Sequence, residues 1–274
     1  MTPVVLVHGF WHASWCWSLV TEQLAASGIP SVAVDLDGHG LRSRSPESRW
    51  RRPFDPAVYA VEPSRTSAVT ASSAAQTLVE QIRAIGGGER VVVVAHSMGG
   101  AVATAAAELE PSLFSHLVYV SAFAPVDGAV AQYSASPENE GEMTSTLLVA
   151  DPMVVGAARL DIGDPSRHSA AREVFYGDVD RATADAAIGL LQPDGPIGIP
   201  AEDFTVTADR FGTVPHSYVV CTKDNAIPVA LQRRFVREID AVSATPTTVT
   251  ELDSSHSPFL SQPAALAAII AGIC

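Results

Sequence analysis

The feature that most constrains the fold is a series of six short runs of apolar, largely β-branched residues. Most of these runs are continuous rather than alternating, as expected of strands buried on both faces of a parallel sheet. Helical patterns separate them; Trp17, Val20 and Leu24, for example, share one helical face before Gly28. The chain therefore predicts an α/β fold with a mostly parallel sheet of about six strands and helices on both faces. The predicted strands are 3–7, 31–35, 90–95, 116–121, 216–221 and 247–252.

The alternation of strand and helix stops in the segment 123–212, which is rich in Gly, Pro and Asp. A stretch of about 90 residues without structure inside a compact domain would be unusual. We therefore predict a helical cap at 123–212, inserted into a core formed by 1–122 and 213–274. Weak helical patterns occur in the cap near 143–149, 166–176 and 180–191.

A second irregular segment, 42–73, follows the second predicted strand and is rich in Arg, Ser and Pro. Five arginines fall within 41–53. We interpret this cluster as a solvated loop rather than a phosphate-binding patch.

Net charge argues against two classes of partner. The chain has 17 Lys and Arg against 30 Asp and Glu, a net charge of −13. Nucleic acids and anionic membrane surfaces carry the same sign and would be repelled. The last apolar stretch, 264–274, is shorter than the roughly 20 residues that span a bilayer. No secretory signal precedes the run at Pro3, so a cytoplasmic location is expected.

Neither cysteines nor histidines indicate a metal site. The three cysteines are far apart and have no metal-binding spacing, so we expect them to be reduced and unpaired. His8, His12 and His39 are the best candidate ligands, but they fall in separate loops without a carboxylate-rich motif. No metal and no organic cofactor is therefore expected.

Chemistry in an open parallel sheet gathers beyond the carboxyl ends of the strands. Ser97, Asp224 and His256 each follow a predicted strand there, in the order Ser, Asp, His. That order is the one found in α/β-hydrolases, where the nucleophile occupies a sharp strand-to-helix turn with the pattern G-x-S-x-G. Here the turn reads Ala95-His96-Ser97-Met98-Gly99, with alanine in place of the first glycine. His96 is expected to project away from the nucleophile.

A serine hydroxyl needs an adjacent base, and a histidine base needs an acid that holds its tautomer. His256 is the only histidine after the last strand, so it is the predicted base. Asp224 is the predicted acid, in preference to Asp253 in the histidine's own loop. The backbone N–H groups of Phe10 and Met98 are the predicted oxyanion hole.

These residues resemble a known group. The opening segment 6–20, LVHGFWHASWCWSLV, and the segment 224–228, DNAIP, are similar to the plant methylesterase and hydroxynitrile lyase branch of the α/β-hydrolase superfamily. Bacterial esterases of that superfamily are an equally good match. The resemblance is weak in the cap and in 42–73, and it covers about 1–40, 88–125 and 216–274.

Two departures bear on the chemistry that the resemblance implies. Lyases of one type have threonine after the first-loop histidine and lysine after the catalytic histidine, where this chain has Gly9 and Ser257. Both departures favour ester hydrolysis. Epoxide and haloalkane hydrolases carry aspartate at the turn, so Ser97 argues against them as well.

The predicted function is a serine hydrolase that cleaves a carboxylic ester of a small or medium-sized, mostly apolar molecule through an acyl-enzyme. The same residues could serve thioesters, lactones, amides or carbon–carbon bonds, and a ligand receptor without turnover is a further alternative. The sequence predicts no oligomeric state and no particular substrate. The predicted pocket walls are Trp11, Phe123, Tyr133 and Phe259.

Overall fold

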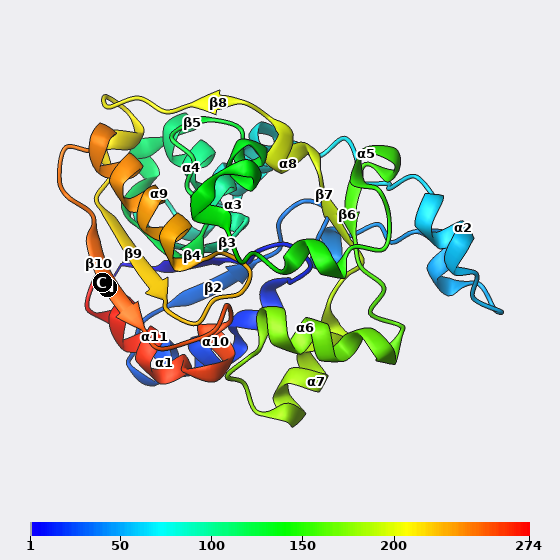
Figure 1. The fold of residues 1–274 in the computed structure, drawn as a ribbon. Coiled ribbons are helices and arrows are strands. Elements are labelled where there is room, and N and C mark those ends of the chain that lie inside the picture. The colour runs from blue at the N-terminus through cyan, green and yellow to red at the C-terminus, as the bar shows by residue number, and fades with distance from the viewer. Residues whose placement is uncertain (1) are drawn as a thin grey trace.

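The computed structural model describes residues 2–274, and the six predicted strands form one sheet (Figure 1). Its order is β10-β9-β4-β3-β1-β2, and every neighbouring pair is parallel. The prediction of a parallel sheet between helices is thus confirmed. The strands are β1 (Val4–Val7), β2 (Ser31–Val34), β3 (Val91–Ser97), β4 (Phe114–Ala122), β9 (His216–Cys221) and β10 (Thr248–Leu252).

Helices cover both faces of this sheet (Figure 1). One face carries α1 (Ser18–Ala26), α10 (Pro258–Ser261) and α11 (Pro263–Ala271), and the other carries α3 (Ala71–Gly86), α4 (Gly99–Leu109) and α9 (Val229–Val242). Local sequence sets the ends of α3. The hydroxyl of Thr70 accepts the backbone N–H of Ser73 at the start of α3, and Gly87 ends the helix with a φ of 59°.

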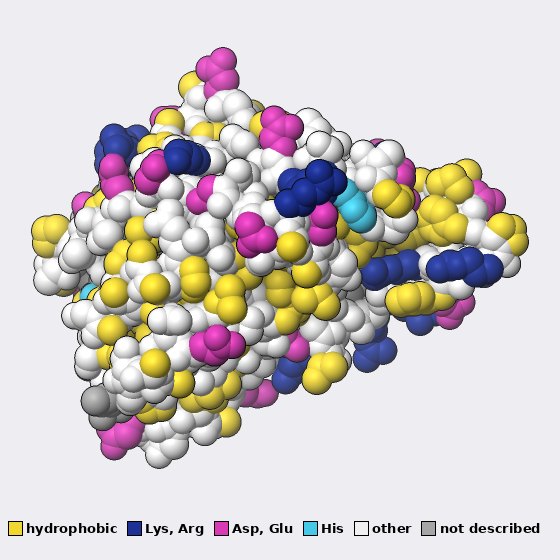
Figure 2. Space-filling model, turned by 90° about the horizontal axis from the view of Figure 1, so that it is seen from below, with side chains coloured by type: hydrophobic (Ala, Val, Ile, Leu, Met, Phe, Trp, Pro, Cys, Tyr) yellow, Lys and Arg dark blue, Asp and Glu magenta, His cyan; other side chains and the backbone are white. Residues whose placement is uncertain are grey.

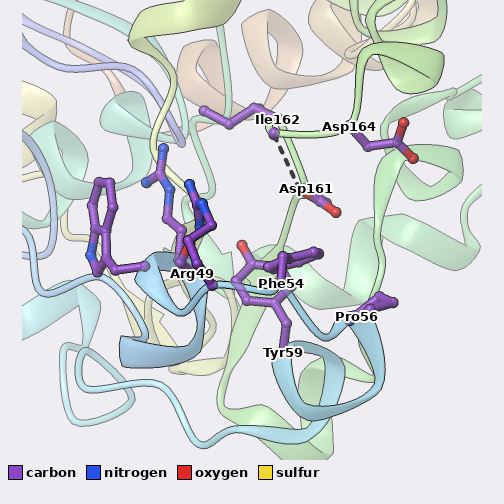
Figure 3. A pocket seen from close by; sticks show the side chains of 10 residues that line it. Arg49, Phe54, Pro56, Tyr59, Asp161, Ile162 and Asp164 are labelled. Atoms are coloured by element: carbon purple, nitrogen blue, oxygen red, sulfur yellow. Dashed lines mark hydrogen bonds between the residues drawn. The ribbon is translucent and has the colours of Figure 1, made fainter.

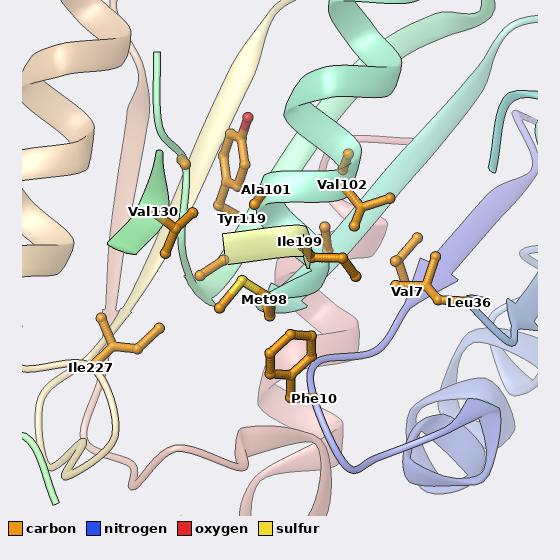
Figure 4. Packing of buried hydrophobic residues seen from close by; sticks show 14 of the residues in the cluster. Val7, Phe10, Leu36, Met98, Ala101, Val102, Tyr119, Val130, Ile199 and Ile227 are labelled. Atoms are coloured by element: carbon orange, nitrogen blue, oxygen red, sulfur yellow. The ribbon is translucent and has the colours of Figure 1, made fainter. Parts of the chain in front are cut away.

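Two apolar clusters explain why the central strands read as continuous apolar runs. Val5 and Val7 of β1 pack into the cluster under α3, α4 and α9, part of which is drawn in Figure 4, whereas Val4 and Leu6 pack against α1 and α11. All four side chains are fully buried. Successive side chains of a strand point to opposite faces, so a strand covered on both sides needs apolar residues at every position. Each fully buried side chain of this kind contributes about 1.5–3 kcal/mol to the hydrophobic stabilisation of the fold.

The segment 123–212 lies between β4 and β9 and contains short elements. Two of its expected helices are present, close to 166–176 and 180–191, but 143–149 contains only the 3-10 helix Thr144–Leu147. The division of the chain into a core and a separate cap stays a prediction. Besides 3-10 helices, the segment contains β5 (Asp127–Gly128) paired with β8 (Phe204–Thr205), α5 (Pro152–Val155), β6 (Ala157–Arg159) paired with β7 (Asp194–Pro196), α6 (His168–Phe175), α7 (Arg181–Leu190) and α8 (Gly198–Ala201).

Residues 42–70, here called the arm, project from the body beside β6 and β7 (Figure 1). The arm contains the 3-10 helix Glu47–Trp50 and α2 (Pro56–Val61). A buried ion pair fastens it: Arg159 of β6 contacts Asp194 of β7 at 2.7 Å and also donates to the Tyr59 carbonyl at 2.6 Å. The sequence indicates an irregular excursion here, but not this clamp.

Within residues 2–274, no helix has both the length and the apolar character needed to span a bilayer. The three cysteines are unpaired, as expected.

Candidate active site

Ser97 lies on a tight turn between β3 and α4. Its φ is 52°, in the left-handed region that non-glycine residues seldom adopt. Two glycines let the helix begin so close to the strand. A Cβ on Gly99 would come within 2.3 Å of the His8 carbonyl oxygen, and one on Gly100 within 2.4 Å of the Phe123 carbonyl oxygen. The glycines after Ser97 are therefore required by close backbone packing.

His256 and Asp224 lie together behind Ser97. The Nδ1 of His256 is 2.8 Å from Oδ2 of Asp224, and both side chains are almost completely buried. Because an ionised carboxylate only accepts hydrogen bonds, the His256 proton is on Nδ1 and its Nε2 is free to accept one. His256 and Ser97 line the same cavity.

The Asp224 carboxylate is surrounded by donors. One oxygen, Oδ1, accepts the backbone N–H groups of Ala226 and Ile227 at 2.7 and 2.9 Å. The other accepts the hydroxyl of Ser121 as well as the imidazole of His256. Both oxygens of this buried carboxylate thus accept hydrogen bonds, which fix its orientation beside His256. The rejected alternative, Asp253, lies at the surface in an ion pair with Lys223 at 2.8 Å.

The first loop packs directly against Ser97. A Cβ on Gly9 would lie 2.5 Å from Cβ of Ser97. This contact places Phe10, the next residue, beside the turn, and Phe10 and Met98 line the cavity together with Ser97. Within residues 2–274, neither backbone N–H of these two residues donates a hydrogen bond.

Two histidines of the first loop hold its backbone. His8 donates from Nδ1 to the Gly9 carbonyl at 2.8 Å, and His12 donates from Nδ1 to the Phe10 carbonyl at 2.9 Å. The hydroxyl of Tyr176 donates to Nε2 of His12 at 2.8 Å. Burial lowers the pKa of His8 and of His12 to about 3, so both rings are neutral near pH 7. The ring nitrogens of both histidines form hydrogen bonds within the protein. Within residues 2–274, no three His, Cys, Asp or Glu side chains form a metal-binding group.

The cavity in front of Ser97 has a volume of about 250 Å³ and mostly apolar walls. Trp11 lines it, together with residues of the segment 123–212 such as Phe123, Tyr133 and Leu148. Trp11 is held by a hydrogen bond of 2.8 Å from its Nε1 to the Ala158 carbonyl.

Phe259 differs from its sequence prediction as a pocket wall. It is fully buried on the other face of the sheet, with its ring 5.4 Å from that of Trp17. Phe259 lies in α10, which packs against α1, and this packing directs its side chain into the core rather than into the cavity.

Two further residues contact the site, and sequence reasoning missed their roles. Ser121 donates its hydroxyl to Asp224 and lies 3.4 Å from Nδ1 of His256. It ends the fourth predicted strand, so an inspection of every strand end would have found it. His96 donates from Nε2 to the backbone carbonyl of His256 at 2.8 Å. Its place beside Ser97 was evident, but the loop that it contacts lies 160 residues away.

Comparison with known proteins agrees with this architecture. Residues 4–269 match the alpha/beta hydrolase family. Methylesterase 7 of Arabidopsis thaliana is 27% identical over 283 residues, covering 97% of this chain and 94% of the relative. A pyrethroid hydrolase of Sphingobium wenxiniae is 26% identical and covers 99% of this chain and 87% of the relative.

A solved structure of a polyneuridine aldehyde esterase has the same fold. It superposes with a TM-score of 0.74 at 23% identity, covering 99% of this chain and 98% of that one. The resemblance to plant methylesterases and bacterial esterases, stated from residues 6–20 and 224–228, is confirmed by the relatives. The chain belongs to the alpha/beta hydrolase family.

Proposed function

We propose that this protein is a serine hydrolase that cleaves carboxylic esters, with Ser97 as nucleophile, His256 as general base and Asp224 as the acid that orients it. The observation that carries the proposal is the 2.8 Å hydrogen bond between the imidazole of His256 and the buried carboxylate of Asp224. Both oxygens of that carboxylate accept further hydrogen bonds, and His256 lines the same cavity as Ser97. The names of the relatives support ester hydrolysis over other uses of the fold.

The reaction proceeds in two halves. Ser97 Oγ attacks the ester carbonyl while Nε2 of His256 takes its proton, and the imidazolium is stabilised by Asp224. The developing oxyanion accepts hydrogen bonds from the N–H groups of Phe10 and Met98, which have no other acceptor among residues 2–274. His256 then returns the proton to the leaving alcohol, and an acyl group stays on Ser97. Water, activated by the same imidazole, releases the acid and restores the serine.

The cavity favours a small or medium-sized apolar substrate. Its volume of about 250 Å³ and its aromatic walls, among them Phe10, Trp11 and Phe175, accommodate a compact apolar acyl group. Relatives named methylesterase and methyl jasmonate esterase favour a small alcohol as the leaving group. A methyl ester of a compact apolar acid is therefore the substrate class we propose.

A panel of esters with matched variants tests this proposal. Ser97→Ala should lower kcat for a short p-nitrophenyl ester by on the order of 10⁴-fold or more, as expected for loss of a nucleophile. Ser145→Ala is the control, because Ser145 also lines the cavity but contacts neither His256 nor Asp224. Equal activity in Ser97→Ala and wild type would contradict the proposal. Thioesters, lactones and mandelonitrile in the same panel test the alternatives, and faster cleavage of any of them than of every ester would contradict ester specificity.

A further inference from the structure

The arm carries a charge opposite to that of the rest of the molecule. Residues 42–52 include five arginines and one glutamate, a net charge of +4, while the whole chain has −13. The remaining residues therefore carry −17. Figure 2 shows basic and hydrophobic side chains next to one another on the projecting end of the molecule. Charge and apolar surface are concentrated together on this segment.

A cavity of about 560 Å³ lies between the arm and the loop 161–164 (Figure 3). Three aromatic side chains of the arm line it, namely Trp50, Phe54 and Tyr59. The rings of Phe54 and Tyr59 are 5.4 Å apart and tilted at 58°. Arg49 and Arg52 are the basic residues in the lining. The cavity thus combines flat apolar walls with two guanidinium groups.

These two guanidinium groups lack a counter-ion among residues 2–274, where no carboxylate lies within 4.0 Å of either group. Arg49 contacts the Ser45 hydroxyl at 3.4 Å and lies 5.0 Å from the Trp50 ring, while Arg52 donates to backbone carbonyls. Burial lowers the pKa of Arg49, although the nearby charges of Asp161 and Asp194 act in the opposite direction. A half-buried guanidinium group that forms no direct ion pair would gain from an anion in contact with it.

Within residues 2–274, the two acidic residues of the cavity form no ion pair with Arg49 or Arg52, although the charge of Asp161 favours the charged form of Arg49. Asp161 accepts the N–H of Gly163 at 3.1 Å, and Asp164 accepts the N–H of Ser166 at 2.9 Å. Both carboxylates are thus engaged within their own loop, and in Figure 3 they point away from Arg49. The space beside the guanidinium groups is open to a ligand.

We propose that this cavity binds a flat aromatic molecule that carries a carboxylate. A guanidinium group matches a carboxylate with two parallel hydrogen bonds, which a point charge does not. Aromatic walls contribute ring-on-ring contacts to the apolar part of such a ligand. An apolar ligand without charge would leave the guanidinium groups unpaired, and a bare inorganic anion would leave the rings uncovered.

The site is separate from the cavity of Ser97, so it does not depend on the proposed hydrolase activity. Strand β6 and the residues after it lie between the two: Ala158 lines the cavity of Ser97, and Asp161 lines the cavity of the arm. Tyr59, which lines the arm cavity, donates its hydroxyl to the Leu160 carbonyl at 2.6 Å.

Calorimetric titration with 2-naphthoate tests the site. Wild type should bind this probe more tightly than 2-naphthamide, which lacks the charge, and more tightly than inorganic phosphate, which lacks the ring. Arg49→Gln should weaken 2-naphthoate binding by about tenfold, since a hydrogen bond to a charged group is lost. Arg51→Gln is the matched control, because it removes the same charge from an exposed arginine that does not line the cavity. It should change the Kd by less than about twofold.

Trp50→Ala provides a second test that does not rely on the folding of the arginine variant, since the Trp50 side chain is 65% exposed. It should also weaken 2-naphthoate binding. Undiminished binding in both Arg49→Gln and Trp50→Ala would place the probe elsewhere, including in the cavity of Ser97, and would overturn the proposal. Failure of wild type to bind 2-naphthoate, or equal losses in Arg49→Gln and Arg51→Gln, would overturn it as well.

Discussion

His96 donates a hydrogen bond from Nε2 to the backbone carbonyl of His256, across 2.8 Å. The two rings lie 4.5 Å apart, and both side chains are buried. A carbonyl oxygen only accepts, so the proton of His96 is on Nε2. Burial, together with the neighbouring His256, lowers the pKa of His96 well below its ordinary value, so His96 is neutral near pH 7. The residue next to the proposed nucleophile thus holds the loop of the proposed base.

Replacing His96 tests this positioning role. His96→Phe keeps the ring packing but removes the donor, and a misplaced base should lower kcat by about tenfold with a smaller change in KM. His96→Gln, whose amide can still donate to the carbonyl, should recover part of the loss. His116→Phe is the control, because the hydrogen bond of His116 goes to the Ser217 hydroxyl and His116 does not line the cavity. A normal kcat in His96→Phe would contradict the role.

Ser121 combines a strained backbone with a hydroxyl that contacts Asp224. Its φ is 39°, a conformation in which glycine is less strained than serine. Ser121→Ala and Ser121→Gly should lower kcat to a similar degree, by about three- to tenfold, because both remove the donor. Ser121→Gly should in addition be the more stable of the two variants in urea unfolding. Full activity in Ser121→Gly would show that only the backbone matters.

The attachment of the arm, and with it the free energy of unfolding, should depend on the ion pair between Arg159 and Asp194. Both are almost fully buried, and removal of one partner leaves an unpaired buried charge. Arg159→Met should therefore lower the free energy of unfolding by about 3–5 kcal/mol. The double variant Arg159→Met/Asp194→Leu should recover much of that loss, measured by urea unfolding. A double variant no more stable than Arg159→Met would contradict this account.

Stability should fall as the pH decreases below about 6.5. Burial lowers the pKa of His8 and His12 to about 3 and of His39 to about 4, from 6.5 in the unfolded chain. Between these values the unfolded chain binds more protons than the folded one, so lowering the pH favours unfolding. Each histidine should lower the free energy of unfolding by about 1.4 kcal/mol between pH 7.5 and 5.5.

Urea unfolding at pH 7.5, 6.5 and 5.5 measures this dependence. A variant such as His12→Gln should show a shallower slope, because one of the neutral histidines is gone. Stability that stays constant over this range would contradict the neutral state of the buried histidines.

The sheet was predictable because its signal is local. Strands buried on both faces must be apolar at every position, so a run such as 90–95 can be recognised as a strand from the sequence. Glycines mark the turns between strand and helix. The strand ends then bring Ser97, Asp224 and His256 to one edge of the sheet. The same rule applies to Ser121, which is visible in the sequence as the end of a strand.

Other features depend on contacts between distant segments and leave no local pattern. Arg159 is one of many scattered polar residues in its segment, and its pairing with Asp194 and the arm follows only from the folded chain. Phe259 is an aromatic residue close to His256 in the sequence, as a residue of the pocket wall would be. Its side chain points into the core because of the way α10 packs, which the sequence does not show. The Arg49 cavity likewise forms between two segments more than 100 residues apart.

The most direct test of the central proposal is mass spectrometry of the protein after reaction with a fluorophosphonate. We expect a single adduct that maps to Ser97, because its hydroxyl lies on the strand-to-helix turn and lines the cavity together with His256, whereas the buried Ser121 does not line that cavity. His256→Ala should react far more slowly, while Ser145→Ala should react like wild type. An unmodified Ser97, or an adduct on a different serine, would contradict the account.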